Sequence, residues 1–153
     1  MHGNPTCLRW IIENWKKQGL PLDLDAKDHN GRSPLYLVCF KGYLGAEGLV
    51  GKTPETQKKR IECVNILLDR RLNDKIADVN FMTDKLNMTP LHWAAYQSDE
   101  QMVELLLANG AVMVETKLGD TPVDMAGFCN EVDTVLVFCR DLEKRFRNKQ
   151  GIF

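Results

Sequence analysis

The chain has 153 residues, which is enough for one domain with a substantial hydrophobic core. Its 20 lysines and arginines nearly balance its 21 aspartates and glutamates, which excludes the global positive field of a nucleic-acid-binding or membrane-surface protein. Five cysteines without a CxxC pair, no apolar run near the ~20 residues of a membrane span and no signal peptide at the start predict a cytoplasmic or otherwise intracellular, reducing location.

The first predicted element is an amphipathic helix close to the N-terminus. Asn4 is a good N-cap residue, Pro5 suits the first helical position, and Gly19 suits the position just after the helix. Between them, apolar residues fall at helical spacing: Leu8, Ile11, Ile12 and Trp15.

Three later segments share one local pattern, at residues 28–35, 84–91 and 116–123. Each has a Gly or Asn that tolerates a left-handed backbone, then a Ser or Thr N-cap, then Pro at the first helical position. The prolines of the first two segments are 56 positions apart, and those of the last two are 32 apart. The pattern predicts a repeat of about 33 residues with one insertion.

The second segment continues as Thr89-Pro90-Leu91-His92-Trp93-Ala94-Ala95, and with these residues the chain resembles the ankyrin-repeat family. The resemblance covers roughly residues 8 to 140 and implies an all-α solenoid of stacked helix-turn-helix units with finger turns. It divides the single domain 1–153 into a partial repeat 4–27, a repeat 28–83 with an insertion at 44–60, a repeat 84–115, and a C-terminal repeat with an extended helix at 116–149.

The extended C-terminal helix carries one apolar stripe among basic residues. The stripe consists of Val132, Val135, Leu136, Cys139, Leu142 and Phe146, and its spacing predicts an amphipathic helix.

Residues 46–53 match a relaxed phosphate-loop pattern. The pattern requires a preceding buried strand and a following helix N-terminus, whereas here a helix end precedes it and Pro54 follows it directly. A nucleotide-binding enzyme that uses this loop is therefore only a remote alternative.

Two other features fit structural roles better than chemical ones, and a third stays open. The resemblance implies that His92 bonds the turn backbone and braces neighbouring repeats, and the cysteine and histidine spacings match no zinc or Cys/His catalytic signature. We therefore expect no catalytic, cofactor-binding or metal-binding residues. Asn80 lies in a stretch that resembles sites of asparagine hydroxylation in some ankyrin repeats, so its modification stays an open hypothesis.

The resemblance implies that finger tips and inner-helix residues line a concave groove. Phe40, Tyr96 and Phe128 fall in matching positions, one aromatic side chain per repeat, and are either partner-binding rings or rings covered by the insertion or by neighbouring repeats. Trp93 shares a buried inter-repeat position with Leu37 and Met125. The expected partner-binding residues are Arg32, Phe40, Lys41, Lys85, Leu86, Met88, Tyr96, Gln97, Leu118, Asp120 and Phe128.

The sequence thus predicts a protein–protein interaction module that binds another protein or peptide, with no nucleic-acid partner, no membrane insertion and no catalysis. We expect it to be a monomer. The alternative is a regulatory or structural segment of a larger enzyme or channel, whose groove packs against its own neighbouring domain.

Overall fold

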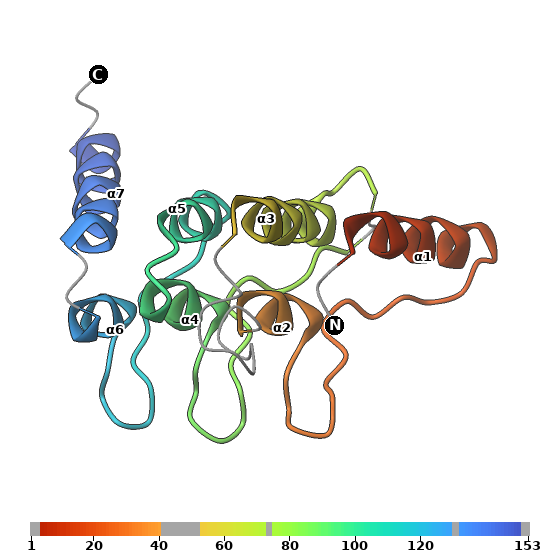
Figure 1. The fold of residues 1–153 in the computed structure, drawn as a ribbon, viewed down its shortest axis with the longest axis horizontal. Helices are drawn as coiled ribbons and strands as arrows, with labels where there is room; N and C mark the ends of the chain where they lie inside the picture. The colour runs from red at the N-terminus through yellow and green to blue at the C-terminus, as the bar shows by residue number, and fades with distance from the viewer. Residues whose placement is uncertain (1–3, 41–52, 73–74, 130–131, 151–153) are drawn as a thin grey trace.

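The computed structural model describes residues 4–40, 53–72, 75–129 and 132–150 (Figure 1). Helices are the only regular elements in these ranges, which confirms the expected all-α repeat fold. They are α1 (Pro5–Lys17), α2 (Pro34–Phe40), α3 (Pro54–Leu68), α4 (Pro90–Tyr96), α5 (Glu100–Ala108), α6 (Pro122–Phe128) and α7 (Val132–Gln150).

The helices form two layers. In Figure 1, α2, α4 and α6 lie side by side in an inner layer, and α1, α3 and α5 lie above them in an outer layer that α7 continues. Each inner helix contacts the outer helix that follows it in the chain, and neighbours within each layer also touch. The three loops that precede α2, α4 and α6 project from the inner layer on the same side (Figure 1).

Local capping chemistry starts the inner helices where the sequence predicts. The Ser33 hydroxyl accepts from the Tyr36 amide at 3.3 Å, and the Thr121 hydroxyl accepts from the Asp124 amide at 3.2 Å. The Asp124 carboxylate accepts in turn from the Thr121 amide at 2.8 Å, which completes a capping box. Proline follows each cap, so the missing N–H removes no helical hydrogen bond.

One continuous core runs through all the stacked units. Leu35, Leu91, Leu106 and Phe138 are almost completely buried and belong to the same cluster of packed side chains. The alanine pair that follows Trp93 is also buried, and its small side chains let α4 pack closely against its neighbours on both sides.

α1 buries fewer of its apolar side chains than their helical spacing in the sequence indicates. Asn4 caps α1 by accepting from the amides of its first turn, and Gly19 adopts a left-handed φ of 65° just past its end. Of the four apolar residues at helical spacing, however, only Ile12 is buried, whereas Ile11 and Trp15 are exposed. α1 packs mainly against α3 in the outer layer, so one narrow face is covered.

The expected insertion at 44–60 has the wrong C-terminal boundary. α3 begins at Pro54, and the Thr53 hydroxyl caps it by accepting from the Thr56 amide at 3.2 Å. Residues 54–60 are therefore the first turns of the outer helix. Residues 44–52 lie outside the described ranges.

A residue in this part of α3 joins the helix to α2 and to Asp99. The guanidinium of Arg60 donates to the carbonyl oxygens of Val38 and Cys39 at 3.1 Å each, at the C-terminal end of α2. It also pairs with the carboxylate of Asp99 at 3.2 Å, and both side chains are largely buried. Arg60 thus supplies charge-assisted donors to carbonyls at the C-terminal end of α2.

The predicted apolar stripe of α7 is not its packing face. Thr134, Val137 and Phe138 are buried against the rest of the molecule, whereas Val132, Leu136, Cys139, Leu142 and Phe146 are exposed. Only Val135 of the predicted stripe packs against the core, and it is partly buried. The helix is thus rotated, relative to the sequence prediction, so that most of its apolar stripe faces outward.

Candidate functional site

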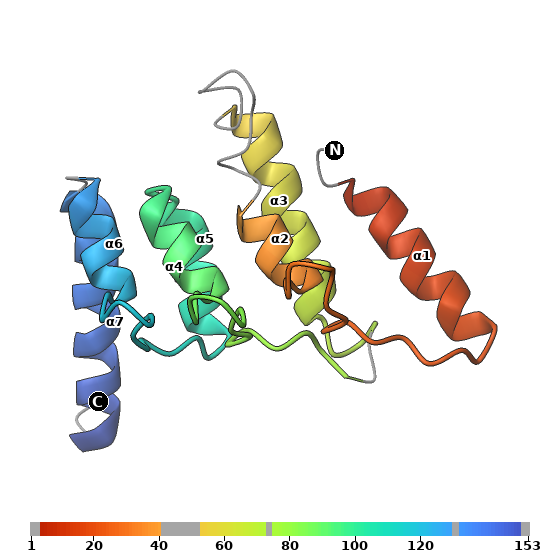
Figure 2. The same cartoon turned by 90° about the horizontal axis from the view of Figure 1, so that it is seen from below.

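The candidate site is the side of the molecule formed by the three finger loops and the inner helices α2, α4 and α6, which we call the finger face (Figure 2 views the molecule from this side). Each finger closes with a backbone hydrogen bond, from Asp28 N to Arg32 O, from Thr83 N to Met88 O and from Thr116 N to Asp120 O. The tips need a left-handed residue, and Gly31, Asn87 and Gly119 adopt φ of 72°, 56° and 87°.

Contacts between neighbouring fingers fix their spacing. The ammonium group of Lys27, in the first finger, lies 2.7 Å from Asp84 Oδ1 in the second, and Lys117 in the third donates to the Asp84 carbonyl at 2.7 Å. The Lys117 amide also donates to the Leu86 carbonyl at 3.0 Å. The Asp84 carboxylate approaches Gly31 so closely that a Cβ there would lie 2.9 Å from its Oδ2.

Aromatic rings from two repeats meet on the inner helices. Trp93 of α4 packs edge-on against Phe40 of α2, with ring centroids 4.6 Å apart, and against Tyr96 at 5.8 Å. Tyr36 stacks on Phe40 at 5.9 Å, and its hydroxyl accepts from the Trp93 indole at 2.5 Å. We call these four residues the aromatic cluster. Tyr36 is buried in it, while the other three rings are partly exposed.

Arg32 connects the first finger to the aromatic cluster. Its guanidinium lies 5.6 Å from the ring centroid of Phe40 and donates two hydrogen bonds to the Asp28 carboxylate, at 2.6 and 2.8 Å. These bonds to Arg32 lower the pKa of Asp28 to about 2. The pair therefore stays charged at neutral pH and holds the guanidinium over the ring.

The finger face also carries isolated apolar side chains. Leu118 at the third finger tip is 77 % exposed and Phe128 at the end of α6 is 68 % exposed. Leu86 at the second tip is exposed as well, beside the exposed Lys85. The end of α6 is tied to α4 because the Cys129 thiol donates to the Tyr96 carbonyl at 2.9 Å.

Two expected binding residues need correction, and one cannot be placed. Met88 and Gln97 were expected on the surface but are buried. Met88 lies at the base of its finger, and Gln97 donates to the Cys39 carbonyl at 2.6 Å. Asp120 is partly covered, and its carbonyl lies 3.3 Å from His92 Nε2. Lys41 lies outside the described residues.

Sequence reasoning missed Trp93 as a surface residue. It was assigned to a buried inter-repeat position with Leu37 and Met125, but all three side chains are only partly buried. The indole is at the centre of the aromatic cluster because Phe40 and Tyr96 lie on either side of it. The size of the Trp93 side chain could have indicated this exposure, because a position between repeats that fits a leucine is too small to enclose an indole ring.

His92 and Tyr36 brace the fingers from below in equivalent positions of α4 and α2. The Thr89 amide donates to His92 Nδ1 at 3.1 Å, so Nδ1 is the acceptor and the Nε2–H group donates to the Asp120 carbonyl of the next repeat. Tyr36 holds the equivalent position in α2, and its hydroxyl joins the first and second repeats by accepting from the Trp93 indole. Burial lowers the pKa of His92 and favours the neutral ring.

Asn80 has a similar bridging role behind the fingers. Its side-chain nitrogen donates to the Gly110 carbonyl at 3.2 Å, and its side-chain oxygen accepts from the Val112 amide at 2.9 Å. Both bonds join the turn after α3 to the turn after α5.

Sequence analysis considered the cysteines for metal or thiol chemistry and residues 46–53 for nucleotide binding. Burial raises the pKa of the Cys39 thiol to about 12, so it stays protonated. No three His, Cys, Asp or Glu side chains gather as metal ligands within the described ranges. Residues 46–52 of the phosphate-loop pattern lie outside those ranges, while the Thr53 hydroxyl caps α3. A helix N-terminus does follow the pattern, contrary to the sequence interpretation.

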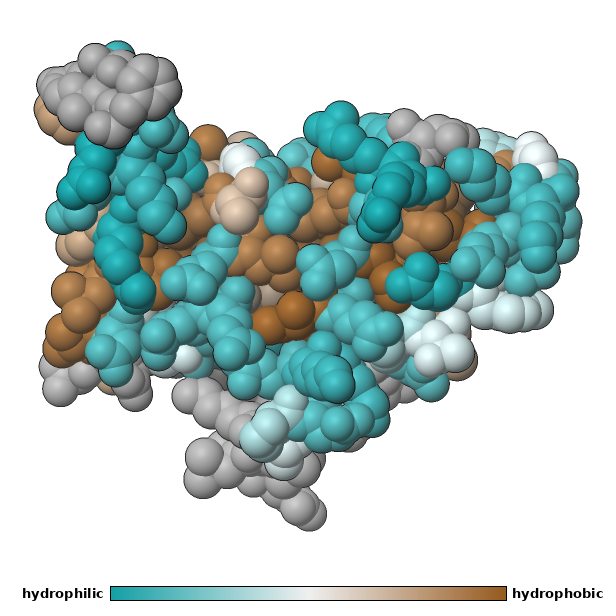
Figure 3. Space-filling model, turned by 90° about the horizontal axis from the view of Figure 1, so that it is seen from above, coloured by the Kyte–Doolittle hydropathy of each residue, from teal (hydrophilic) through white to brown (hydrophobic). Residues whose placement is uncertain are grey.

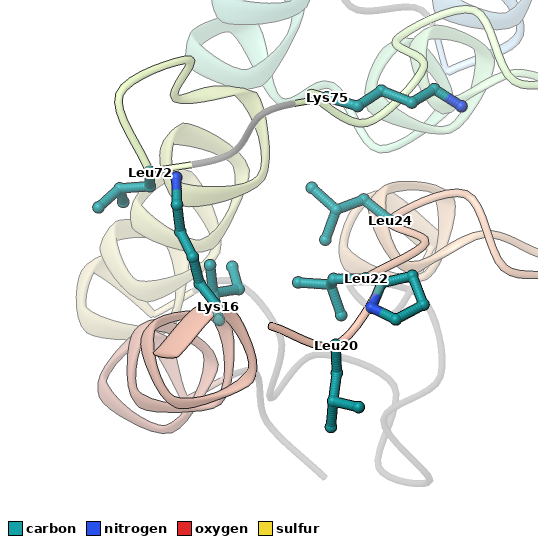
Figure 4. A pocket seen from close by; sticks show the side chains of 8 residues that line it. Lys16, Leu20, Leu22, Leu24, Leu72 and Lys75 are labelled. Carbon is teal, nitrogen blue, oxygen red and sulfur yellow. The ribbon is translucent and has the colours of Figure 1, made fainter. Parts of the chain in front are cut away.

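A small pocket lies away from the finger face, between the end of α1 and the segment that follows it (Figure 4). Its volume is about 160 Å³. Apolar side chains line most of it, including Ile12, Leu22, Leu24 and Leu72, and Lys16 and Lys75 complete the lining. The Lys75 ammonium lies 3.4 Å from Asp25 Oδ2, which leaves a mainly apolar indentation without a catalytic arrangement.

Comparison with known families identifies the repeats. A family model described as ankyrin repeats, in three copies, matches residues 55–148, which is more than half of the chain. No curated protein matches the sequence. Within the described residues, no helix combines the length and the apolar character needed to cross a membrane.

Proposed function

The chain belongs to the ankyrin-repeat family, whose repeats are generally protein–protein interaction modules, and from this we propose that it binds a segment of another protein on its finger face without catalysing a reaction. The aromatic cluster, in which Trp93 joins Phe40 and Tyr96 across two repeats, is the observation that carries the proposal. Aromatic side chains supply a large contact area at low entropic cost and are enriched among the residues that dominate interface energies.

The finger face suits a partner segment with apolar side chains. Phe128 and Leu118 are largely exposed at one end, and the partly exposed rings of the aromatic cluster lie on the two inner helices before α6. The hydrogen bonds and ion pair between fingers hold this surface in place before binding, which reduces the entropy lost on association. Lys85 adds positive charge beside the exposed Leu86 and favours a partner segment that also carries carboxylates.

Peptide display provides a direct test. A random-peptide library would be selected against the wild-type chain, and the affinity of each enriched peptide would then be measured for the wild type and for the variants Phe128→Ser and Tyr96→Ser. We expect each variant to weaken binding by at least ~2 kcal/mol, the scale of an interface hot spot. Phe128→Ser should leave the thermal stability nearly unchanged because the ring is mostly exposed.

Trp10→Ser is the matched control. Trp10 is 64 % exposed, close to the exposure of Phe128, but it lies on the outer-layer helix α1. This variant should bind the selected peptides like the wild type. Peptides that lose affinity with Trp10→Ser but not with Phe128→Ser would place the binding surface on α1 and contradict the proposal.

A further inference from the structure

The exposed apolar side chains of α7 form a second surface that the finger face does not use. Val132 is 66 % exposed, Leu142 52 % and Phe146 62 %, and Cys139 is exposed between them. A different face of the helix packs against α5 and α6 and buries Phe138. The exposed side chains therefore point away from the stack.

The C-terminal part of α7 projects from the molecule in a fixed direction. α7 has 19 residues against 9 in α5, and Figure 2 shows its C-terminal end past the other helices. The guanidinium of Arg145 donates to the Ala111 carbonyl at 3.2 Å, and its Nε lies 2.6 Å from Asp141 Oδ2. These contacts anchor one side of the helix to the stack, while residues 142–149 are all exposed.

The same part of α7 concentrates positive charge. Residues 140–149 contain five lysines and arginines and two acidic residues, in a chain whose net charge is −1. One of the five, Arg145, pairs with Asp141. The other four basic side chains are exposed: Arg140, Lys144, Arg147 and Lys149. Figure 3, seen from the side of the outer helices, shows hydrophilic surface over the C-terminal part of α7 and hydrophobic surface at the lower left, over its N-terminal part. The balanced charge of the whole chain thus conceals a local basic region.

The exposed apolar face is broad, and basic side chains lie at both of its edges. At 3.6 residues per turn, positions 132, 136, 139, 142 and 146 cover an arc of about 120° around the helix. Arg140 and Arg147 follow one edge of this arc and Lys149 follows the other, while Glu143 is the one acidic residue of this helix inside it. A flat anionic surface meets both edges at once. A single partner helix instead covers a narrow seam with alternating intervals of three and four, which these positions do not follow.

A helix with leucine and phenylalanine on one face and lysine and arginine beside them is suited to lie in a membrane interface. Its apolar face enters the boundary between headgroups and acyl chains, and the long basic side chains extend to the lipid phosphates. We propose that α7 binds the chain to a membrane surface rich in anionic lipid, with Leu142 and Phe146 toward the acyl chains and Arg140, Arg147 and Lys149 at the headgroups. The inference is independent of the proposed function, because the finger face lies on other elements. Cytoplasmic leaflets carry phosphatidylserine, which agrees with the reducing location that the sequence predicts.

Cosedimentation with lipid vesicles tests the association. The wild type should bind vesicles of phosphatidylcholine that contain phosphatidylserine, bind vesicles of phosphatidylcholine alone far more weakly, and lose affinity as the salt concentration rises. Arg147→Gln should lower the partition coefficient about fivefold, because the attraction of one basic side chain to the surface is lost. Phe146→Ser should lower it at least about tenfold, because the ring no longer enters the interface.

Two matched controls and one opposite variant complete this test. Leu118→Ser changes an exposed leucine of the third finger and Lys58→Gln an exposed lysine of α3, so both should bind like the wild type. Glu143→Gln should strengthen binding, because it removes the acidic group within the arc. A wild type that ignores the phosphatidylserine vesicles, or controls that lose as much affinity as Phe146→Ser, would overturn the proposal. A loss with Arg147→Gln but none with Phe146→Ser would indicate binding by charge alone, as to a soluble polyanion, and would also contradict it.

A fluorescent probe tests the orientation of the helix. In a chain with Cys7→Ser and Cys129→Ser, an environment-sensitive fluorophore would be attached to Cys139, at the centre of the arc. In a second chain that also has Cys139→Ser, it would be attached through Asn148→Cys. Positions 139 and 148 lie on opposite sides of the helix, about 180° apart. Phosphatidylserine vesicles should shift the emission to shorter wavelength at position 139 and leave it nearly unchanged at position 148. Equal shifts at both positions, or no shift at position 139, contradict the proposal.

Discussion

At the scale of single residues, the hydrogen bonds of buried and half-buried polar side chains fix the positions of the finger loops. His92 bridges two repeats through the Thr89 amide and the Asp120 carbonyl, and Arg32 joins Asp28 to the Phe40 ring. The bond that His92 Nδ1 accepts from the Thr89 amide needs the neutral ring, whereas the Arg32 pair needs the ionised carboxylate. The two sites therefore respond to pH in different ranges.

The Asp28 carboxyl should titrate far below an ordinary aspartate. Its pKa in the folded chain is about 2 against a reference of 3.8, chiefly because Arg32 donates to it. The stability that this difference contributes is complete above pH 3.8 and is lost as the pH falls toward 2. Carboxyl chemical shifts followed by NMR should show the low midpoint, and Arg32→Gln should raise it, with part of the lowering retained because the Asn30 and Arg32 amides still donate to the carboxylate. A wild-type midpoint near the reference value would mean that the pair is not formed in solution.

His92 should make the fold sensitive to mild acid. Burial lowers its pKa in the folded chain below the reference of 6.5, so stability is complete above pH 6.5 and declines as the pH falls below it. His92→Gln should cost about 1–3 kcal/mol at neutral pH because buried partners lose their bonds. It should also remove most of the pH dependence between neutral and mildly acidic conditions in chemical denaturation.

His29→Gln is the control, because His29 is exposed on the first finger. This variant should keep both the neutral-pH stability and the acid sensitivity of the wild type. If His29→Gln abolished the acid sensitivity and His92→Gln did not, His92 would not be the group that titrates.

At the scale of elements, α3 is longer than the outer helix α5 of the next repeat. Its early start at Pro54 places Arg60 where the guanidinium reaches both the end of α2 and the buried Asp99 carboxylate. Asp99 also caps α5 by accepting from the Met102 amide at 3.2 Å, and Gln57 donates to it at 3.0 Å. One network thus joins the ends of three helices.

Arg60→Met should destabilise the fold by roughly 3 kcal/mol, because it leaves Asp99 charged and largely buried without its cation. Lys59→Met is the matched control: Lys59 pairs with Glu55 at the surface, and its loss should cost less than about 1 kcal/mol. Urea denaturation of the two variants measures both effects. If Arg60→Met and Lys59→Met lowered the free energy of unfolding equally, the buried network would contribute no more than a surface ion pair.

At the scale of the whole molecule, stability should vary along the stack because each unit touches only its neighbours. The units in the middle are covered on both sides, and α5 buries Met102, Val103, Leu106 and Leu107. The first helix, α1, buries only Pro5 and Ile12. The ends of the array should therefore open more readily than the centre.

Hydrogen exchange should reveal this gradient. The amides of α4 and α5 should exchange slowest and those of α1 fastest, and Leu106→Ala should cost roughly 2–5 kcal/mol through lost burial and the cavity that it leaves. Mass spectrometry of peptic fragments measures the exchange rates. Uniform protection across α1, α4 and α5 would indicate that the chain opens only as one cooperative unit.

The sequence by itself determined the family, the all-α repeat fold and the positions where the inner helices begin. These features depend on residues within four positions of one another, as with the Thr121 cap and Asp124, or the left-handed Gly31 and Gly119. Such local interactions are fixed by the order of the residues alone.

Only the tertiary structure decided which faces are buried. Met88 and Gln97 are covered, Trp93 is partly exposed, and the apolar stripe of α7 points outward while Thr134 and Phe138 point inward. A helical pattern gives the apolar face of a helix but not its rotation against its neighbours, which depends on how side chains from distant parts of the chain fit together. The start of α3 at Pro54 has a local signal, a threonine cap followed by proline, whereas the contacts of Arg60 with α2 and Asp99 join distant parts of the chain that no local pattern connects.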